Sequence, residues 1–187
     1  MARVDNRVDQ IIAVSAKFFS QRGFAATTVR DLAGELGIST GSVFHHFATK
    51  EDILVAVVER GLANATDRIN RMLEGVEDPR ERVATIILGH LISLHRGGPE
   101  SMSFMFYEWW SLSNETKAKI VSFRDSYEAI WVKEINRLKE VGLAPKDPSL
   151  FRLFIFGAMN WSAQWYHPGS PQSVEEVAAY LAEVFLG

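Results

Sequence analysis

Apolar residues recur every three to four positions along almost the whole chain, which is the spacing of one face of an α-helix. No stretch keeps the strict alternation of apolar and polar residues that a half-buried strand requires. In the first segment Val8, Ile12 and Phe19 fall on one helical face, and Asp5 or Asn6 can cap the helix. The pattern predicts an all-α fold.

Polar motifs near the N-terminus predict where the next helices begin. Thr28 and Asp31 have the spacing of a capping box, which opens a short helix that Gly37 ends. Ser39 can cap a second short helix, TGSVFHHF, and Thr49 can begin a long helix that runs to about residue 73. Two short helices joined by a glycine-containing turn are typical of a helix-turn-helix.

Glycine, proline and asparagine divide the remainder into further helices. We expect these helices at about 79–96, 101–111, 115–141, 148–166 and 173–186. The two functional parts are expected to be a three-helix N-terminal domain over 1–50 and a helical ligand-binding and dimerisation domain over 51–187.

The segment FAATTVRDLAGELGISTGSVFHHFATKEDIL, residues 24–54, resembles the TetR family of one-component regulators. The TTVRDLA opening, the GIS turn, the VFHHF recognition helix and the TKEDIL start of the next helix follow the family's order and spacing. The resemblance implies about nine helices, a homodimer, binding to a double-stranded DNA operator, and a ligand pocket in a divergent C-terminal domain.

The residues themselves support a DNA-reading role. A recognition helix buries one face and presents small or polar groups from its first turn to the major groove. Ile38, Val43 and Phe47 can face inward in this segment. The helix amide ends, a few basic residues and the outward side chains can meet phosphates and base edges. The candidate DNA-binding residues are Thr28, Arg30, Ser39, Thr40, Gly41, Ser42, Phe44, His45, His46 and Lys50.

Some of these residues have other uses. Gly41 can serve close helix packing, His46 can be a core histidine bonded to a carbonyl, and Lys50 can be a solvated residue at a helix start. Phe44 replaces the tyrosine that is common in the family, so one hydroxyl contact to the DNA backbone is missing. Its ring can still pack on a sugar or a thymine methyl group.

A second motif suggests different chemistry. GISTG, residues 37–41, matches the G-x-S-x-G nucleophile elbow of serine hydrolases, with Ser39 as the nucleophile. That elbow follows a strand, whereas the preceding DLAGEL has the pattern of a helix. No carboxylate pair or metal-ligand spacing stands out, so we expect no enzyme, no metal and no cofactor.

Composition and charge narrow the setting. The chain has no cysteine, no signal-peptide pattern and no long apolar run, so we expect a cytoplasmic protein without a membrane segment. Net charge is −3, but residues 1–50 contain six basic and four acidic side chains. A mildly basic N-terminal part on an acidic remainder suits local contact with DNA.

The second half of the chain is rich in aromatic residues, which are either core or the lining of an apolar cavity. Polar side chains on these helices could orient a hydrophobic effector. The candidate ligand-binding residues are His90, Phe106, Tyr107, Trp110, Arg124, Tyr127, Trp131 and Asn160.

The last two helices carry more apolar surface than one layer can bury, which suggests an intersubunit four-helix bundle, with a purely intrachain pair as the alternative. The predicted dimer seam comprises Leu153, Gly157, Trp161, Gln164, Val177 and Leu181. NWSAQWYHPGS, residues 160–170, also resembles the tail of TetR-type regulators of lipid degradation that sense acyl-CoA thioesters. That resemblance suggests an acyl-CoA effector, with an aromatic or drug-like compound as its rival.

The sequence therefore predicts a ligand-responsive repressor. Two other functions stay open, a helical ligand carrier that does not bind DNA and a serine hydrolase that uses Ser39. A strand before Gly37 would favour the hydrolase. The polar first turn of the second short helix argues against a simple carrier, which has no need of it.

Overall fold

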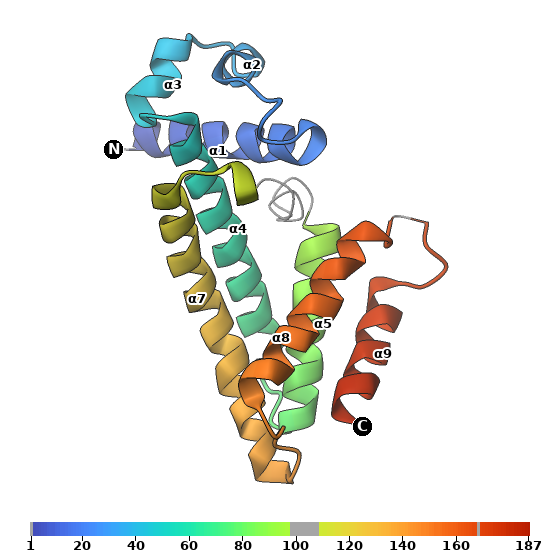
Figure 1. Cartoon of the computed structure of the whole chain (residues 1–187). Coiled ribbons are helices and arrows are strands. Elements are labelled where there is room, and N and C mark those ends of the chain that lie inside the picture. Colours follow the sequence, from blue (N-terminus) through green and yellow to red (C-terminus); the bar gives the residue numbers. More distant parts are fainter. Residues whose placement is uncertain (1, 98–108, 168) are drawn as a thin grey trace. The chain divides into compact units, whose positions relative to one another are not determined.

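The computed structural model describes residues 2–97, 109–167 and 169–187, and within them the chain forms eight α-helices and no β-strand (Figure 1). The helices are α1 (Ala2–Arg22), α2 (Val29–Glu35), α3 (Thr40–His46), α4 (Lys50–Met72), α5 (Pro79–Arg96), α7 (Asn114–Arg137), α8 (Pro148–Trp161) and α9 (Val174–Leu186). Three short 3-10 turns accompany them, η3 (Trp109–Ser111), η4 (Leu138–Val141) and η5 (Ser162–Gln164). The predicted all-α fold is confirmed.

Most predicted helix positions agree with the structure, with two differences. The first helix begins at Ala2, so neither Asp5 nor Asn6 caps it; residues 2–7 contain no glycine or proline and can continue the helix. Most of the helix expected at 101–111 lies outside the described residues. In the described part of the chain, no helix is long and apolar enough to cross a membrane.

One compact unit, here called the head unit, comprises residues 1–62 and 98–123. Its core is built from apolar side chains of α1, α2, α3 and the first half of α4. Two residues from much later in the chain, Leu112 and Ile120, complete the same core. The head unit therefore contains the helix-turn-helix and the start of α7.

The second compact unit, here called the body unit, comprises residues 63–97 and 124–187. Within it α5 packs along α9 and also against α8. Gly89 on α5 allows a close approach to α4, because a Cβ at this position would lie 2.7 Å from Cγ1 of Ile69. Asp78 and Asp147 cap α5 and α8, and in both helices a proline occupies the first turn.

These units divide the chain differently from the boundary expected at residue 50. The division falls between residues 62 and 63 inside α4, and again between residues 123 and 124 inside α7. Periodicity could not reveal either point, because both helices continue without interruption from one unit into the other.

Candidate functional site

Side-chain hydrogen bonds cap the N-termini of both helices of the helix-turn-helix in the head unit. The Thr28 hydroxyl accepts a hydrogen bond from the Asp31 amide at 3.2 Å, and the Asp31 carboxylate accepts one from the Thr28 amide at 2.8 Å. The Thr28 hydroxyl also donates to this carboxylate, and these bonds lower the pKa of Asp31. After Gly37, whose φ of +63° favours glycine, the Ser39 hydroxyl accepts a hydrogen bond from the Ser42 amide in the first turn of α3 at 3.1 Å. The predicted capping motifs are confirmed.

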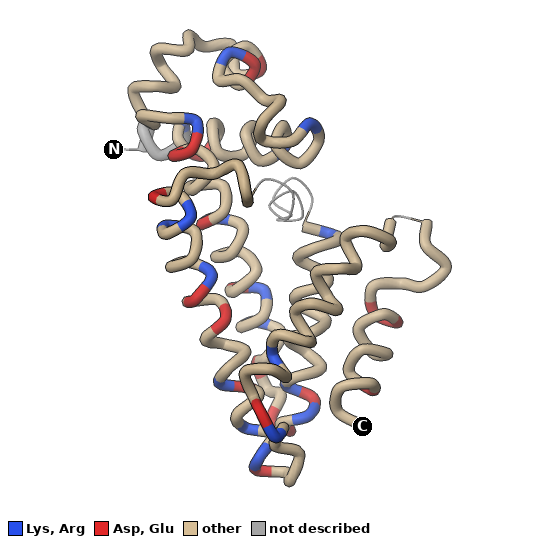
Figure 2. The backbone as a smooth tube through the Cα atoms, in the orientation of Figure 1, with Lys and Arg blue, Asp and Glu red and all other residues tan. Residues whose placement is uncertain are grey.

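The helix α3 has the two faces that a recognition helix needs. Val43 is fully buried, and Ile38 and Phe47 pack partly buried against the head core. The outward residues Thr40, Gly41, Ser42 and His45 are exposed, as is Phe44 at 49%. His46 is half-buried. The α3 sequence TGSVFHH contains no Lys, Arg, Asp or Glu, and the α3 tube has no charged position in Figure 2.

Gly41 lies in open space. A Cβ at this position would approach only the Ser39 hydroxyl, at 3.7 Å, which is an ordinary contact. The interpretation of Gly41 as a helix-packing glycine is therefore wrong. The space in front of the first turn of α3 is available to a molecule outside the chain.

The structure corrects the expectation that Lys50 contacts phosphate. Its ammonium group donates to the carbonyl oxygens of Phe24 at 2.8 Å and Thr27 at 2.9 Å, and it lies 4.1 Å from the centre of the Phe24 ring. Lys50 therefore ties the loop between α1 and α2 to the start of α4. The interpretation of Lys50 as a merely solvated residue is wrong as well. Arg30 is exposed on α2 and stays a candidate for phosphate contact.

The serine hydrolase alternative is also wrong. The residues before Gly37 form helix α2, whereas a nucleophile elbow follows a strand. The Ser39 side chain caps α3 and lies 3.0 Å from the Ser42 hydroxyl. In the described part of the chain no group of His, Asp and Glu residues could hold a metal ion.

A second feature of the head unit escaped the sequence analysis. The Glu51 carboxylate, in the first turn of α4, accepts hydrogen bonds from the Ser113 hydroxyl at 2.5 Å and from the Thr116 hydroxyl. These donors, Ser113 first, lower the pKa of Glu51. Lys119 lies 3.7 Å from the Asp52 carboxylate beside them. The start of α7 is thereby fixed to the helix that follows the recognition helix.

In the body unit a polar cluster joins three helices. His90 on α5 lies 2.9 Å from the Tyr127 hydroxyl on α7 through Nδ1, and 3.0 Å from Asn160 Oδ1 on α8 through Nε2. Trp131 and Phe156 surround the imidazole, with ring centres 5.9 Å and 5.4 Å away. We call these five residues the His90 cluster.

Burial controls the charge state of this cluster. It lowers the pKa of His90 to about 4, an effect that the Asn160 hydrogen bond opposes, and it raises the pKa of the Tyr127 phenol. Both groups are therefore neutral at pH 7. Four of the eight predicted ligand-binding residues meet here, namely His90, Tyr127, Trp131 and Asn160. Phe156 was missed, because an apolar residue between apolar neighbours gives no distinguishing signal.

The other predicted ligand-binding residues do not join the cluster. Trp110 belongs to the head unit and is 84% exposed, so the expectation that it borders a cavity is wrong. Arg124 is a surface residue of the body unit, 3.3 Å from Glu128, which also pairs with Arg152. Glu128 balances the charge of Arg124 outside the cluster, which corrects the prediction that Arg124 binds the ligand. The remaining two, Phe106 and Tyr107, lie outside the described residues.

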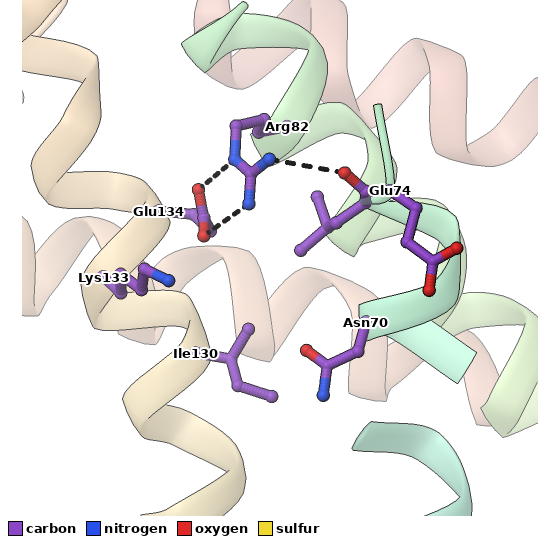
Figure 3. A pocket seen from close by; sticks show the side chains of 7 residues that line it. Asn70, Glu74, Arg82, Ile130, Lys133 and Glu134 are labelled. Atoms are coloured by element: carbon purple, nitrogen blue, oxygen red, sulfur yellow. Dashed lines mark hydrogen bonds and ion pairs between the residues drawn. The ribbon is translucent and has the colours of Figure 1, made fainter. Parts of the chain in front are cut away.

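A separate hollow of the body unit, about 230 Å³ in volume, surrounds a buried ion pair (Figure 3). Arg82 donates to the two carboxylate oxygens of Glu134 at 2.6 and 3.0 Å, and to the Val76 carbonyl at 2.5 Å. Burial alone would raise the pKa of Glu134, but the Arg82 hydrogen bonds and charge outweigh it and leave this pKa lowered. Charged and apolar side chains line this hollow together, and its ion pair joins α5 to α7.

Residues of the predicted dimer seam lie on an open face of α8. Leu153 and Trp161 are 55% and 67% exposed, and a Cβ on Gly157 would meet nothing within 4 Å. Gln164 is exposed beside them. Arg152 is the only charged residue of α8, which is almost entirely tan in Figure 2.

The part of the predicted seam on α9 differs from expectation. Val177 and Leu181 are half-buried, whereas the exposed large apolar residues of this helix are Tyr180 and Val184. The reason is that α9 packs along α5, so that its inner face is already occupied. Within one chain α8 and α9 both pack on α5, and apolar faces of both helices stay uncovered.

The fold and the head unit define a helix-turn-helix protein with a helical body. Residues 11–57 match the family model described as bacterial regulatory proteins of the tetR family, and residues 76–187 match a tetracyclin repressor-like C-terminal domain. The second match covers more than half of the chain. The chain belongs to the TetR family of transcriptional regulators.

Three known proteins illustrate this similarity. The transcriptional repressor KstR2 of Mycobacterium tuberculosis is 26% identical over 188 residues, which cover 99% of this chain and 94% of KstR2. The crystal structure of the superantigen PfiT is 36% identical, with a TM-score of 0.82 and coverage of 95% and 94%. AibR in complex with isovaleryl coenzyme A and operator DNA shares the fold at 20% identity, with a TM-score of 0.84 and coverage of 96% and 98%.

Proposed function

We propose that this protein is a dimeric repressor that leaves its operator when a hydrophobic small molecule enters the body unit. The observation that carries the proposal is the presence of two features on one chain. The first is the uncharged, exposed first turn of α3. The second is the His90 cluster, a small polar group enclosed by aromatic rings.

In the proposed complex, α3 enters the major groove and reads bases through neutral groups. Thr40, Ser42 and His45 offer hydroxyl and imidazole hydrogen bonds, and Gly41 allows the backbone to come close. The exposed ring of Phe44 packs on a sugar or a thymine methyl group. Because α3 contains no Lys or Arg, we assign the attraction of phosphates to neighbouring groups, with Arg30 and the capped N-termini of α2 and α3 as candidates.

The open faces of α8 and α9 support the proposed homodimer. Large apolar side chains that stay exposed in one chain, such as Phe154 and Trp161, are typical of a surface that a partner covers. Two copies that bring α8 and α9 together would form an intersubunit four-helix bundle. The twofold arrangement would place two α3 helices in successive major grooves of a palindromic operator.

An acyl-CoA is the effector that we propose first. KstR2 is described as a ketosteroid transcriptional regulator, and AibR was crystallised with isovaleryl coenzyme A. Residues 160–170, at the end of α8 and beyond it, carry the resemblance to regulators of lipid degradation. Tyr166 in this segment packs on His95 with ring centres 4.4 Å apart, so it also has a structural role. An aromatic compound is the rival effector.

The experiment begins by selecting genomic DNA fragments with the purified protein and footprinting them. Octanoyl-CoA is then titrated against the complex, with octanoate and CoA alone as controls. A coupling of about 1–3 kcal/mol would weaken DNA binding by about 5- to 150-fold. His45→Ala should change base preference, whereas Ser149→Ala on α8 should not. A protein that selects no DNA above background would overturn the proposal.

A further inference from the structure

Three consecutive residues in the first turn of α4 bind different parts of the head unit. Lys50 donates to two carbonyl oxygens of the loop before α2. Asp52 forms a capping box with Thr49, because its carboxylate accepts from the Thr49 amide at 3.0 Å and its amide donates to the Thr49 hydroxyl at 3.0 Å. Glu51, between them, binds the start of α7. The first turn of α4 therefore joins the segments on either side of the helix-turn-helix to α7.

This turn lies close to the recognition helix along the chain. Residues 47–49 alone separate the end of α3 at His46 from the start of α4 at Lys50. The Phe47 amide donates to the Val43 carbonyl at 3.0 Å, and the Phe47 ring packs against the head core. At the other end of the connection, Thr49 is held by its capping box. A connection this short and this well bonded leaves little slack, so a rotation of the first turn of α4 would also move α3.

The contact of Glu51 with α7 uses both carboxylate oxygens. Oε2 accepts from the Ser113 hydroxyl at 2.5 Å and from the Thr116 hydroxyl, and Oε1 accepts from the Ser113 amide at 3.4 Å. Thr116 is 5% exposed, so its hydroxyl is held inside the head unit. The Ser113 hydroxyl also accepts from the Thr116 amide at 3.2 Å and thereby caps α7. These bonds define both where α7 begins and how its first turn faces α4.

Packing alone does not fix this end of α7. Leu112 and Ile120 lie in the head core, but contacts between apolar side chains are not directional. Beside the Glu51 bonds there is a hollow of about 410 Å³, lined by residues of α4, α7 and the loop before α2, including Lys119 and Phe24. Because side chains do not fill this space, the directional bonds of Glu51 set the register of α7 against α4.

We propose that Glu51 is a positioning residue for DNA recognition. By binding Ser113 and Thr116 it holds the first turn of α4, and through this turn α3, in the orientation that reads the operator. The DNA-reading unit then includes the start of α7, although Ser113 follows Glu51 by 62 residues. This inference rests on the proposed function, because it concerns the same DNA-binding surface.

Two variants remove the contact in different ways. Glu51→Gln keeps the size of the side chain but has one acceptor oxygen for three donors. Thr116→Val keeps the buried shape and removes one of these donors. Each variant should bind a genomic DNA fragment selected by the parent about tenfold more weakly, as loss of a hydrogen bond to a charged group does. Removal of a negative charge would by itself strengthen DNA binding, so the result expected for Glu51→Gln has the opposite direction.

Glu115→Gln is the matched control. Glu115 lies in the first turn of α7, where its side chain is 81% exposed and pairs with Lys119 at 2.9 Å. The control removes the same charge beside the contact and leaves the Glu51 bonds in place, so binding to the fragment should not weaken. The double variant Glu51→Gln/Thr116→Val should bind about as weakly as the weaker single variant, because both changes remove one shared contact.

Hydrogen exchange of the full chain without DNA tests the positioning itself. The amides of residues 40–49 should exchange faster in Glu51→Gln and Thr116→Val than in the parent, and at the parent rate in Glu115→Gln. The melting temperature of each variant gives its folded fraction, and affinities are compared for equal amounts of folded protein. If Glu51→Gln does not fold, the comparison of Thr116→Val with Glu115→Gln decides the question.

An affinity for the fragment that stays unchanged in both Glu51→Gln and Thr116→Val would overturn the inference. So would a loss of affinity that Glu115→Gln reproduces, which is an effect of charge, or one that the unfolded fraction explains, which is an ordinary structural role. A parent protein that selects no DNA contradicts the proposed function instead. In that case the exchange of residues 40–49 still shows whether Glu51 holds α3.

Discussion

The neutral state of His90 makes the stability of the protein depend on pH in a range that can be calculated. Burial, opposed by the Asn160 hydrogen bond and helped by the nearby His95, lowers the pKa of His90 from its ordinary value of 6.5 to about 4. Between these two values the unfolded chain binds a proton at residue 90 and the folded chain does not. The free energy of unfolding therefore falls as the pH falls through this window.

The size of the effect follows from the pKa difference. One unit of pKa corresponds to about 1.4 kcal/mol, so the full loss is about 3 kcal/mol below pH 4 and about 2 kcal/mol at pH 5. Above pH 6.5 both states are neutral at this position, and the contribution of His90 no longer changes with pH.

Urea unfolding at pH 7 and pH 5 measures this contribution when the parent is compared with His90→Gln. The glutamine amide keeps one donor and one acceptor but does not titrate. His95, whose pKa burial also lowers, is present in both proteins, so its effect cancels. Both proteins are measured at one concentration, because dimerisation would change the apparent stability.

The parent should lose about 2 kcal/mol more than His90→Gln between the two pH values. Equal losses would show that water or a proton reaches His90 in the folded state. In that case the interpretation of the His90 cluster as neutral in the folded protein would be wrong.

Three further predictions concern the dimer, the DNA contact and the buried ion pair. Gly157→Arg should convert a dimer into a monomer by light scattering and weaken operator binding; a dimer that persists at low micromolar concentration would contradict the proposed seam. Arg30→Ala should weaken binding to all duplexes alike and lower the salt slope by about one unit, whereas Lys50→Met should lower the melting temperature without changing that slope. Arg82→Met should lower the free energy of unfolding by about 3 kcal/mol, because the buried Glu134 carboxylate loses its hydrogen-bonded partner and keeps Arg137, at 3.9 Å, as its remaining ion pair; urea denaturation showing a much smaller loss would mean that Arg137 or solvent stabilises this carboxylate.

The helix starts could be predicted because their determinants are local. At Thr28 and Ser39 the capping side chain and the amide that it accepts from are three residues apart, so that both are visible in one short motif. The inward and outward faces of α3 follow in the same way from its period.

Other roles could not be predicted, because their partners are distant in the sequence. The carbonyl groups that hold Lys50 are 26 and 23 residues away, and Arg82 is 52 residues from Glu134. The sequence pattern identifies His90 as a polar residue on a largely apolar helix, but only the packing of α5, α7 and α8 shows what it contacts. The prediction for Trp110 failed for another reason: an aromatic residue in an apolar sequence was expected to border a cavity, but its ring is exposed on the surface.

The core of the head unit can close only late in the synthesis of the protein. Leu112 and Ile120 pack in the same cluster as Phe19, Leu32 and Val43, although they follow them by roughly seventy or more positions in the chain. The ribosome therefore releases the whole helix-turn-helix, and the rest of α4 and α5, before this core can close. A fragment ending at residue 62 would leave those apolar surfaces uncovered. A nascent chain must keep them from aggregating until α7 emerges.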